Sequence, residues 1–190
     1  MEIRSFLAFE LPEEIKGIVS RVSGEMKKSP LDVRWVNVDN IHLTVIFTGN
    51  MSEDRLAGMD RVVKHVCHNY GPFDISLSSA GVFSSRRNPR VLWIGLAGDI
   101  ERMSLFRNTL QESLKPFGIK VEKRRFNPHL TLGRFRKGAK SGVHLDEILL
   151  RYRTLNSPVR FISELVLFKS DLKPGGAVYT KLNAWPLAGQ

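Results

Sequence analysis

The stretches His42-Leu43-Thr44-Val45 and His129-Leu130-Thr131-Leu132 repeat one pattern, once in each half of a 190-residue chain. Each stretch lies in a run that reads as a β-strand, over residues 41–47 and 129–135. Because side chains alternate between the two faces of a strand, each histidine should share a face with the threonine two residues later. The aliphatic residues between them should face a core. The pattern therefore predicts two strands that each present an imidazole and a hydroxyl on one face.

A single His-x-Thr pair has a structural interpretation as well as a functional one. Threonine favours strands, and a lone histidine is often a satisfied structural residue. Two copies at matched positions in two similar half-chains are much harder to explain by chance. The repetition therefore favours a functional role for both pairs.

Composition indicates an ordinary globular protein of 21.6 kDa, folded as one large domain or as two closely packed lobes. The single cysteine, Cys67, rules out an intramolecular disulfide and fits a reducing cytoplasm. No run approaches the roughly 18 to 20 apolar residues that a membrane span needs. The first residues resemble a strand rather than a signal peptide. We expect a cytoplasmic protein that does not enter a membrane.

The formal net charge is +10 and the sequence pI is about 10.0. Such a charge attracts polyanions, but it can also serve only solubility. Two basic clusters, Arg86-Arg87-Asn88-Pro89-Arg90 and residues 120–125, lie close in sequence to the motif strands or their neighbours. Their position favours a polyanionic partner.

Both halves read as strand, helix, strand, motif strand and helix, which predicts an internal duplication within a single bilobal domain of residues 1–190. The approximate halves are residues 1–97 and 98–190. Helices are predicted from Pro12, after Ser52, after Asp99 and over residues 144–152. Besides the motif strands, we expect strands over residues 3–9, 33–36, 73–77, 91–96, 119–121, 159–168 and 178–182. A loop with Gly81 and the first basic cluster should separate residues 73–77 from 91–96.

Two imidazoles can supply an acid and a base near neutral pH. Hydroxyl donors on Thr44 and Thr131 can stabilise the negative charge that develops on phosphate oxygens. Neither motif has a carboxylate within two residues on its own predicted face, as a catalytic metal site usually would. Residues His65, Cys67 and His68 hint at a metal, but an ordinary helix face explains them better. The chemistry indicated is hydrolysis of a phosphodiester without a metal or other cofactor.

Beyond the motifs, the segments 90–93, 126–132 and 172–179 (Arg-Val-Leu-Trp, Phe-Asn-Pro-His-Leu-Thr-Leu and Leu-Lys-Pro-Gly-Gly-Ala-Val-Tyr) extend the pattern over nearly the whole chain. Together they resemble the two-histidine phosphoesterase superfamily, in its bacterial and archaeal RNA 2′,3′-cyclic phosphodiesterase (2′-5′ RNA ligase-like) branch. The resemblance implies an α+β fold of two pseudo-symmetric lobes. Each lobe would be a mainly antiparallel sheet with helices packed outside, and an active cleft would lie between the lobes.

The resemblance also implies catalytic roles. His42 would donate a proton to the leaving 3′ oxygen, and His129 would accept one from water, which leaves a 2′-phosphomonoester. A weak reverse 2′-5′ ligation is implied by the family name. From the sequence alone the two histidines are indistinguishable.

Arg134 matches a basic position of the family and would bind the substrate phosphate with Thr44 and Thr131. Regular alternation would place it on the face opposite His129, unless Gly133 kinks or ends the strand. Ile46 departs from the family pattern, since relatives commonly carry lysine there.

Further RNA contacts are open to two interpretations. Phe47 and Phe9 could stack on a base, although core packing is the commoner role of such residues. Arg86, Arg87 and Arg90 could follow RNA phosphates or form a solvated loop.

The partner expected is RNA with 2′,3′-cyclic phosphate or 2′-5′ linked ends, bound by a monomer with no obligate protein partner. The alternatives are a non-catalytic binder of RNA ends and a phosphodiesterase for another 2′-linked or cyclic nucleotide. The candidates of that last kind are ADP-ribose 1″,2″-cyclic phosphate and 2′-5′ oligoadenylate, because the motifs read phosphate rather than base.

Overall fold

A computed structural model describes residues 2–139 and 142–189 of the chain. Its helices and strands, in chain order, are β1 (Glu2–Phe9), α1 (Glu13–Met26), β2 (Val33–Trp35), η1 (Val38–Asn40), β3 (Leu43–Ser52), α2 (Glu53–His68), β4 (Phe73–Ser85), β5 (Asn88–Gly98), α3 (Ile100–Leu114), η2 (Lys115–Phe117), β6 (His129–Phe135), α4 (Gly142–Arg151), β7 (Arg160–Ile162), β8 (Glu164–Lys173) and β9 (Gly176–Pro186). Within these residues, no helix is both long and apolar enough to cross a membrane.

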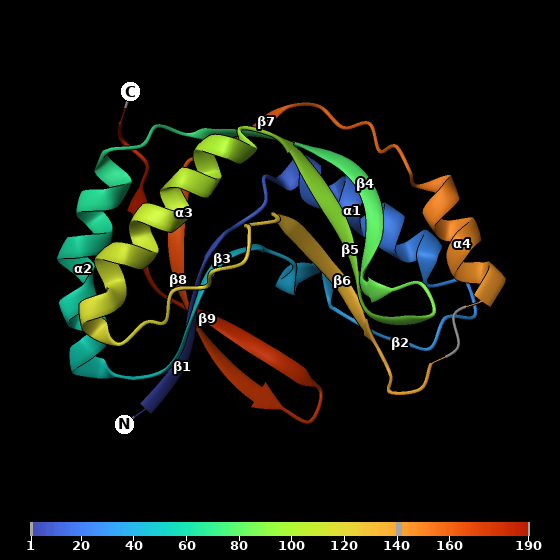
Figure 1. Cartoon of the computed structure of the whole chain (residues 1–190), viewed down its shortest axis with the longest axis horizontal. Coiled ribbons are helices and arrows are strands. Elements are labelled where there is room, and N and C mark those ends of the chain that lie inside the picture. The colour runs from blue at the N-terminus through green and yellow to red at the C-terminus, as the bar shows by residue number, and fades with distance from the viewer. Residues whose placement is uncertain (1, 140–141, 190) are drawn as a thin grey trace.

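Within the described residues, the strands form one nine-stranded sheet with the two motif strands at its centre (Figure 1). Its order is β7-β4-β5-β6-β3-β1-β8-β9, and β2 pairs with β6 outside this path. Every strand pairing in the described residues is antiparallel. The last strands of the chain, β8 and β9, thus extend the side of the sheet that begins with β3 and β1.

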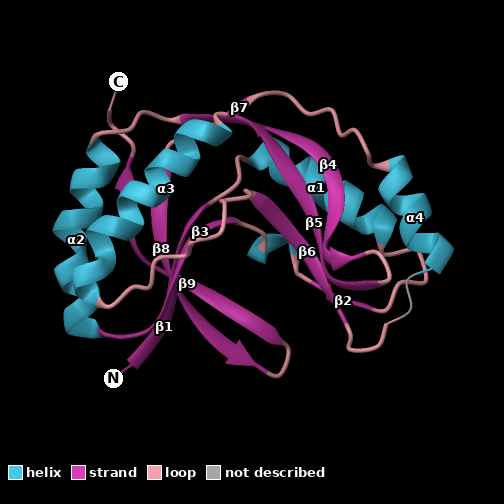
Figure 2. Ribbon diagram, viewed as in Figure 1, coloured by secondary structure: helices cyan, strands magenta, loops and turns pink. Residues whose placement is uncertain are grey.

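The helices lie in two groups, α2 with α3 and α1 with α4, on opposite sides of the molecule (Figure 2). Each long helix buries residues spaced three or four apart, for example Ile15, Val19 and Val22 on α1. The predicted α+β fold with a mainly antiparallel sheet is confirmed.

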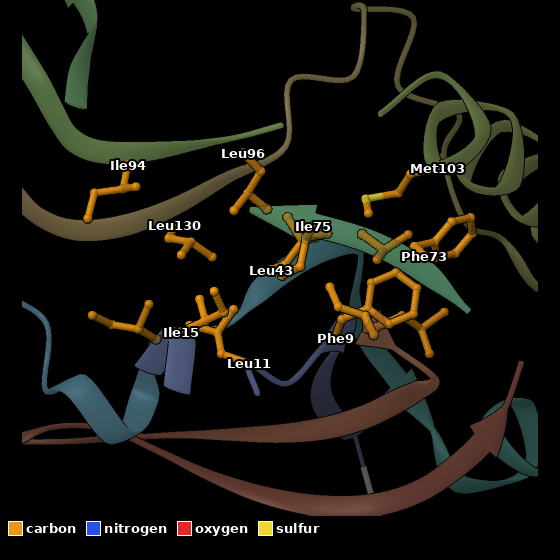
Figure 3. Close-up of a cluster of buried hydrophobic side chains, with 14 of the residues drawn as sticks. Phe9, Leu11, Ile15, Leu43, Phe73, Ile75, Ile94, Leu96, Met103 and Leu130 are labelled. Atoms are coloured by element: carbon orange, nitrogen blue, oxygen red, sulfur yellow. The ribbon is translucent and has the colours of Figure 1, made fainter. Parts of the chain in front are cut away.

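The main core fixes which face each motif strand turns inward. Leu43 of β3 and Leu130 of β6 are both fully buried and lie in a cluster with residues of other strands and helices (Figure 3). Full burial of a leucine side chain contributes about 1.5–3 kcal/mol, so rotating either strand to expose its leucine would be costly. The histidines and threonines beside these leucines must therefore face the other way.

The long β4–β5 hairpin replaces the loop that was expected around Gly81. Gly81 lies inside β4, and a Cβ atom there would come within 2.3 Å of the Trp93 ring. Its role is to give space to the indole of the neighbouring strand. Two further expectations were wrong: residues 119–121 form no strand, and residues 159–168 divide into β7 and β8 at Ser163.

Candidate active site

The two motifs meet where the central strands pair. Leu43 pairs with Leu130 in antiparallel register. In an antiparallel pair, one residue back along one strand corresponds to one residue forward along the other. His42 therefore lies opposite Thr131. By the same rule, Thr44 lies opposite His129. Directly opposed residues have Cβ atoms about 4.5–5.5 Å apart, so two imidazoles and two hydroxyls share one small area of the sheet.

We call the sheet face that carries these four side chains the site face. It is the face turned away from Leu43 and Leu130. On the β1 side, strand residues form a second, smaller apolar cluster. Its members are Phe6, Ala8, Val166 and Phe168, and Tyr179 and Ala184 pack against it.

Both imidazoles are held by the same main-chain contact. The Nδ1 atom of His42 lies 2.8 Å from the backbone oxygen of Asn40, and that of His129 lies 2.8 Å from the backbone oxygen of Asn127. A carbonyl oxygen can only accept, so Nδ1 carries the proton in both rings. In the neutral form, Nε2 of each ring is then free to accept a proton or, once protonated, to donate one.

Each imidazole also contacts one or more aromatic rings. The His42 ring stacks on Phe6 with centroids 4.6 Å apart, and the edge of Tyr179 approaches it at 5.3 Å. His129 meets Phe83 edge-on, also at 4.6 Å. A backbone oxygen and an aromatic ring together thus fix the orientation of each histidine.

Burial lowers the pKa of both histidines below the usual value, and the carbonyl hydrogen bonds offset this only in part. The charge of Arg134 lowers the pKa of His129 further. Both rings are therefore mainly neutral at pH 7 in the free protein. A bound phosphate anion would raise both pKa values and favour protonation of one ring.

A β-bulge brings Arg134 to the site face. Trp93 pairs with Thr131 but Leu92 pairs with Gly133, so Leu132 is an extra residue on β6. The alternation of side chains shifts by one position there, and Arg134 pairs with Val91 on the same face as Thr131. Regular alternation would have placed it on the opposite face, which explains why the sequence alone left the position of Arg134 open.

The first motif strand has the equivalent bulge. Ala8 pairs with Thr44 and Leu7 with Ile46, so Val45 is the extra residue on β3. Phe47 then pairs with Phe6 and occupies the position that Arg134 has on β6. The Phe47 side chain is 70 % exposed. Ile46 is buried in the main core.

Sequence reasoning missed Arg34. Strand β2 pairs with β6 so that Arg34 lies opposite Arg134, and neither side chain has an ion-pair partner among the described residues. Like charges directly opposite one another repel, and an anion bound between them would relieve the repulsion. Only the pairing of β2 with β6 reveals this, because nothing in the sequence links residue 34 to residue 134.

Phe9 is not available to an RNA base, so the possible contact with RNA is wrong for this residue and core packing, the commoner role, is confirmed. Its side chain is 0 % exposed and packs against Phe73 and Phe106, with centroids 5.8 Å away in both cases. Residues 6–9 form an uninterrupted apolar run, which does not show which side chains face the core. The ring that stands beside His42 is Phe6.

The arginines of the first basic cluster are exposed at the end of the β4–β5 hairpin. Arg86 forms an ion pair with Asp146 at 3.3 Å. Contacts of Arg86, Arg87 and Arg90 with RNA remain predictions. In the described parts of the chain, no group of three or more histidine, cysteine, aspartate or glutamate side chains is arranged to hold a metal ion.

Comparison with known families decides how this geometry should be interpreted. The model of the 2′-5′ RNA ligase superfamily matches residues 11–173, which is most of the chain. The chain belongs to this superfamily. Its two histidine motifs and the strands that carry them lie within the matched region.

Individual relatives are similar to this chain over nearly its full length. A protein of Methanothermobacter thermautotrophicus named RNA 2′,3′-cyclic phosphodiesterase is 33 % identical, over 98 % of this chain and 100 % of the relative. The crystal structure of E. coli LigT complexed with 3′-AMP has a TM-score of 0.77 at 25 % identity, covering 98 % of this chain and 99 % of LigT. TT0787 of Thermus thermophilus shares the fold, with a TM-score of 0.81 at 23 % identity over 99 % of this chain and 100 % of that one.

Proposed function

We propose that this member of the 2′-5′ RNA ligase superfamily hydrolyses RNA 2′,3′-cyclic phosphodiester ends to 2′-phosphomonoesters without a metal. The observation that carries the proposal is the pairing of Leu43 with Leu130, because in this register each imidazole lies opposite a threonine of the other motif. Its relatives that are named RNA 2′,3′-cyclic phosphodiesterase supply the substrate class.

In this mechanism, Nε2 of His129 accepts a proton from water as the water oxygen attacks phosphorus. The bond between phosphorus and the ribose 3′ oxygen breaks, and protonated His42 donates its Nε2 proton to that oxygen. The phosphate remains on the 2′ oxygen. The assignment of base to His129 and acid to His42 follows the family, because the contacts of the two Nδ1 atoms are alike.

The hydroxyls of Thr44 and Thr131 donate to the phosphate oxygens that carry charge in the transition state. Arg134 binds the same phosphate, and the opposed Arg34 adds a second positive charge beside it. A bound anion raises the pKa of His42, which is what keeps the proton donor charged near pH 7. In this proposal, the positive charges that stabilise the phosphate therefore come from the protein's own side chains.

The natural substrate in this proposal is an RNA in the cytoplasm, bound by a monomer without an obligate protein partner. The net charge of +10 suits a polyanionic substrate. Phe47, exposed beside Phe6, offers a surface for the terminal base. Weak 2′-5′ ligation would be the same reaction in reverse.

End-group analysis of a 5′-labelled RNA with a 2′,3′-cyclic terminus tests the proposal. In excess EDTA the protein should convert the cyclic end to a 2′-phosphate and produce no 3′-phosphate. A product with a 3′-phosphate would overturn the regiochemistry. Loss of turnover in EDTA would overturn the metal-independent mechanism.

The basic surface also fits a protein that binds RNA ends without turnover. Affinity and single-turnover hydrolysis, measured on one labelled RNA, separate the two functions. Tight binding with no product would favour the binder. Parallel assays with a 2′-5′ oligoadenylate and with ADP-ribose 1″,2″-cyclic phosphate test the other nucleotide substrates of such a site.

A further inference from the structure

A cavity of about 360 Å³ lies between α3 and the segment that leads into β6, and its lining includes none of the four motif side chains. Its walls are Glu101, Ser104, Leu105, Arg107 and Asn108 of α3, and residues 122–126 of the segment. Ligand pockets commonly measure about 300–1,000 Å³, so the space is sufficient for a phosphate with part of its sugar or base. Nothing in the proposed mechanism uses this cavity.

Arg107 is the unusual residue of this cavity. Its side chain is only 6 % exposed, yet its Nε finds no hydrogen-bond partner among the described residues. One of its terminal nitrogens donates to the backbone oxygen of Arg124 at a long 3.4 Å. Burial lowers the pKa of the guanidinium, and the charge of Glu122 offsets this only in part. A buried cation with unused donors is costly unless a ligand satisfies it.

The charge of the cavity suits an anion. The residues that line the cavity include four cationic ones (Arg107, Lys123, Arg124 and Arg125) and two acidic ones, Glu101 and Glu122. The Glu122 carboxylate already accepts from the backbone nitrogen of Arg124 at 3.0 Å. Residues 122–125 are exposed, so their charged side chains can reach a ligand without unfolding the segment.

Phe126 gives the cavity an aromatic wall. Its ring lies 5.4 Å from the Arg107 guanidinium carbon. Aromatic rings beside cations are the usual surface for single-stranded nucleic acid, because the bases stack while the cations bind the backbone. This combination favours RNA over a small inorganic anion.

The cavity is connected to the site face through a short piece of chain. Figure 1 shows the segment running from the end of α3 back along that helix to the start of β6. Phe126 lies three residues before His129, so their Cα atoms are at most about 10 Å apart. The intervening Asn127 supplies the oxygen that holds Nδ1 of His129. The segment that lines the cavity therefore leads directly into the strand that carries His129.

We propose that the cavity lined by Arg107, Lys123, Arg124, Arg125 and Phe126 is a second RNA subsite, which binds the first phosphodiesters upstream of the cyclic end. The inference rests on the proposed function, because it takes the cyclic end to lie at the paired histidines. It makes the protein select RNA chains over free cyclic nucleotides. Arg107 binds a phosphate with its unused donors, and the exposed cations hold the neighbouring backbone.

The test compares two substrates that share the same reacting group: adenosine 2′,3′-cyclic phosphate, and an RNA oligomer that ends in it. The double variant Arg124→Gln/Arg125→Gln removes exposed charges and should leave the fold intact. It should lower kcat/KM for the oligomer about tenfold and leave that for the mononucleotide unchanged. The slope of log kcat/KM against log salt concentration should fall by about 0.7 for each phosphate that the variant no longer neutralises, for the oligomer alone.

Two further variants separate this role from a structural one. Arg107→Lys keeps a charge in the cavity but loses the planar donors, and it should reduce only oligomer turnover. If Arg107 served only to brace the segment before His129, both substrates would lose activity together. The control Arg21→Gln/Arg153→Gln removes the same charge from exposed positions on α1 and just after α4, and it should change neither rate.

Equal effects on both substrates, or no effect on the oligomer, would overturn the subsite and leave the proposed function standing. A wild-type protein that hydrolysed neither substrate would overturn the proposed function, and the subsite with it.

Discussion

The half-site on β3 and the half-site on β6 share a backbone and differ in a few side chains. Each has a histidine held by the carbonyl oxygen two residues earlier, a threonine on the same face, and a bulge directly after that threonine. At the next position on the site face, β3 carries Phe47 and β6 carries Arg134. The comparison shows that repetition supplies the geometry, and that substitution at matched positions can supply the difference between the two ends of a substrate.

Removal of either imidazole should have the largest effect, because one ring must accept a proton while the other donates one. We expect His42→Ala and His129→Ala each to lower kcat about 10²- to 10⁴-fold on a cyclic-phosphate oligomer. His65→Ala, at an exposed position on α2, is the matched control and should retain normal turnover. Normal rates in either site variant would remove the basis of the proposed mechanism.

The threonines come next in expected effect. Thr44→Val and Thr131→Val keep the shape of the side chain and delete one donor to the phosphate, so kcat should fall about 10- to 100-fold in each. Because each threonine lies opposite the histidine of the other half, the two losses should be similar. A loss confined to one of them would show that only one half-site contacts the charged oxygens.

Arg134→Gln tests what distinguishes the β6 half-site. Loss of a charged contact should raise KM about tenfold. Because the charge of Arg134 lowers the pKa of His129, its removal should raise that pKa. A base must be deprotonated to act, so if His129 is the base, the acidic limb of the pH profile of kcat/KM moves to higher pH. Movement of the basic limb instead would make His129 the acid and reverse the two assigned roles.

Phe47→Ala should have the smallest effect. A base stacked on this exposed ring would lose about 1 kcal/mol, which corresponds to a roughly fivefold increase in KM with kcat unchanged. Leu182→Ala is a suitable control, since it removes another exposed apolar side chain, on β9. An unchanged KM in Phe47→Ala would indicate that the terminal base lies elsewhere.

Much of the fold was predictable because the two motifs carry a strong local signal. The second motif strand, residues 129–135, has the predicted bounds, and the helices begin near Pro12, Ser52 and Asp99 as expected. Gly81 was misinterpreted because a glycine that makes space for an indole in another strand resembles a turn residue in the sequence.

The surroundings of the histidines were harder to predict from the sequence, because they depend on strand register. The bulge at Leu132 shows only in the pairing of β6 with β5, and it alone determines the face of Arg134. Arg34 reaches that face through pairing between strands far apart in sequence. Trp93 and Tyr179 lie in segments that were singled out by resemblance, yet no pattern in the sequence indicated which face of the sheet they occupy.

The carbonyl anchors of the two imidazoles have a consequence for how the sequence can change over time. Because every amino acid carries a backbone oxygen, replacing the side chain of Asn40 or Asn127 does not delete the acceptor that sets the tautomer. Only a change in the path of the main chain can do that. The orientation of both rings is therefore protected against most point substitutions at those two positions, and an insertion or deletion just before either histidine should be tolerated least.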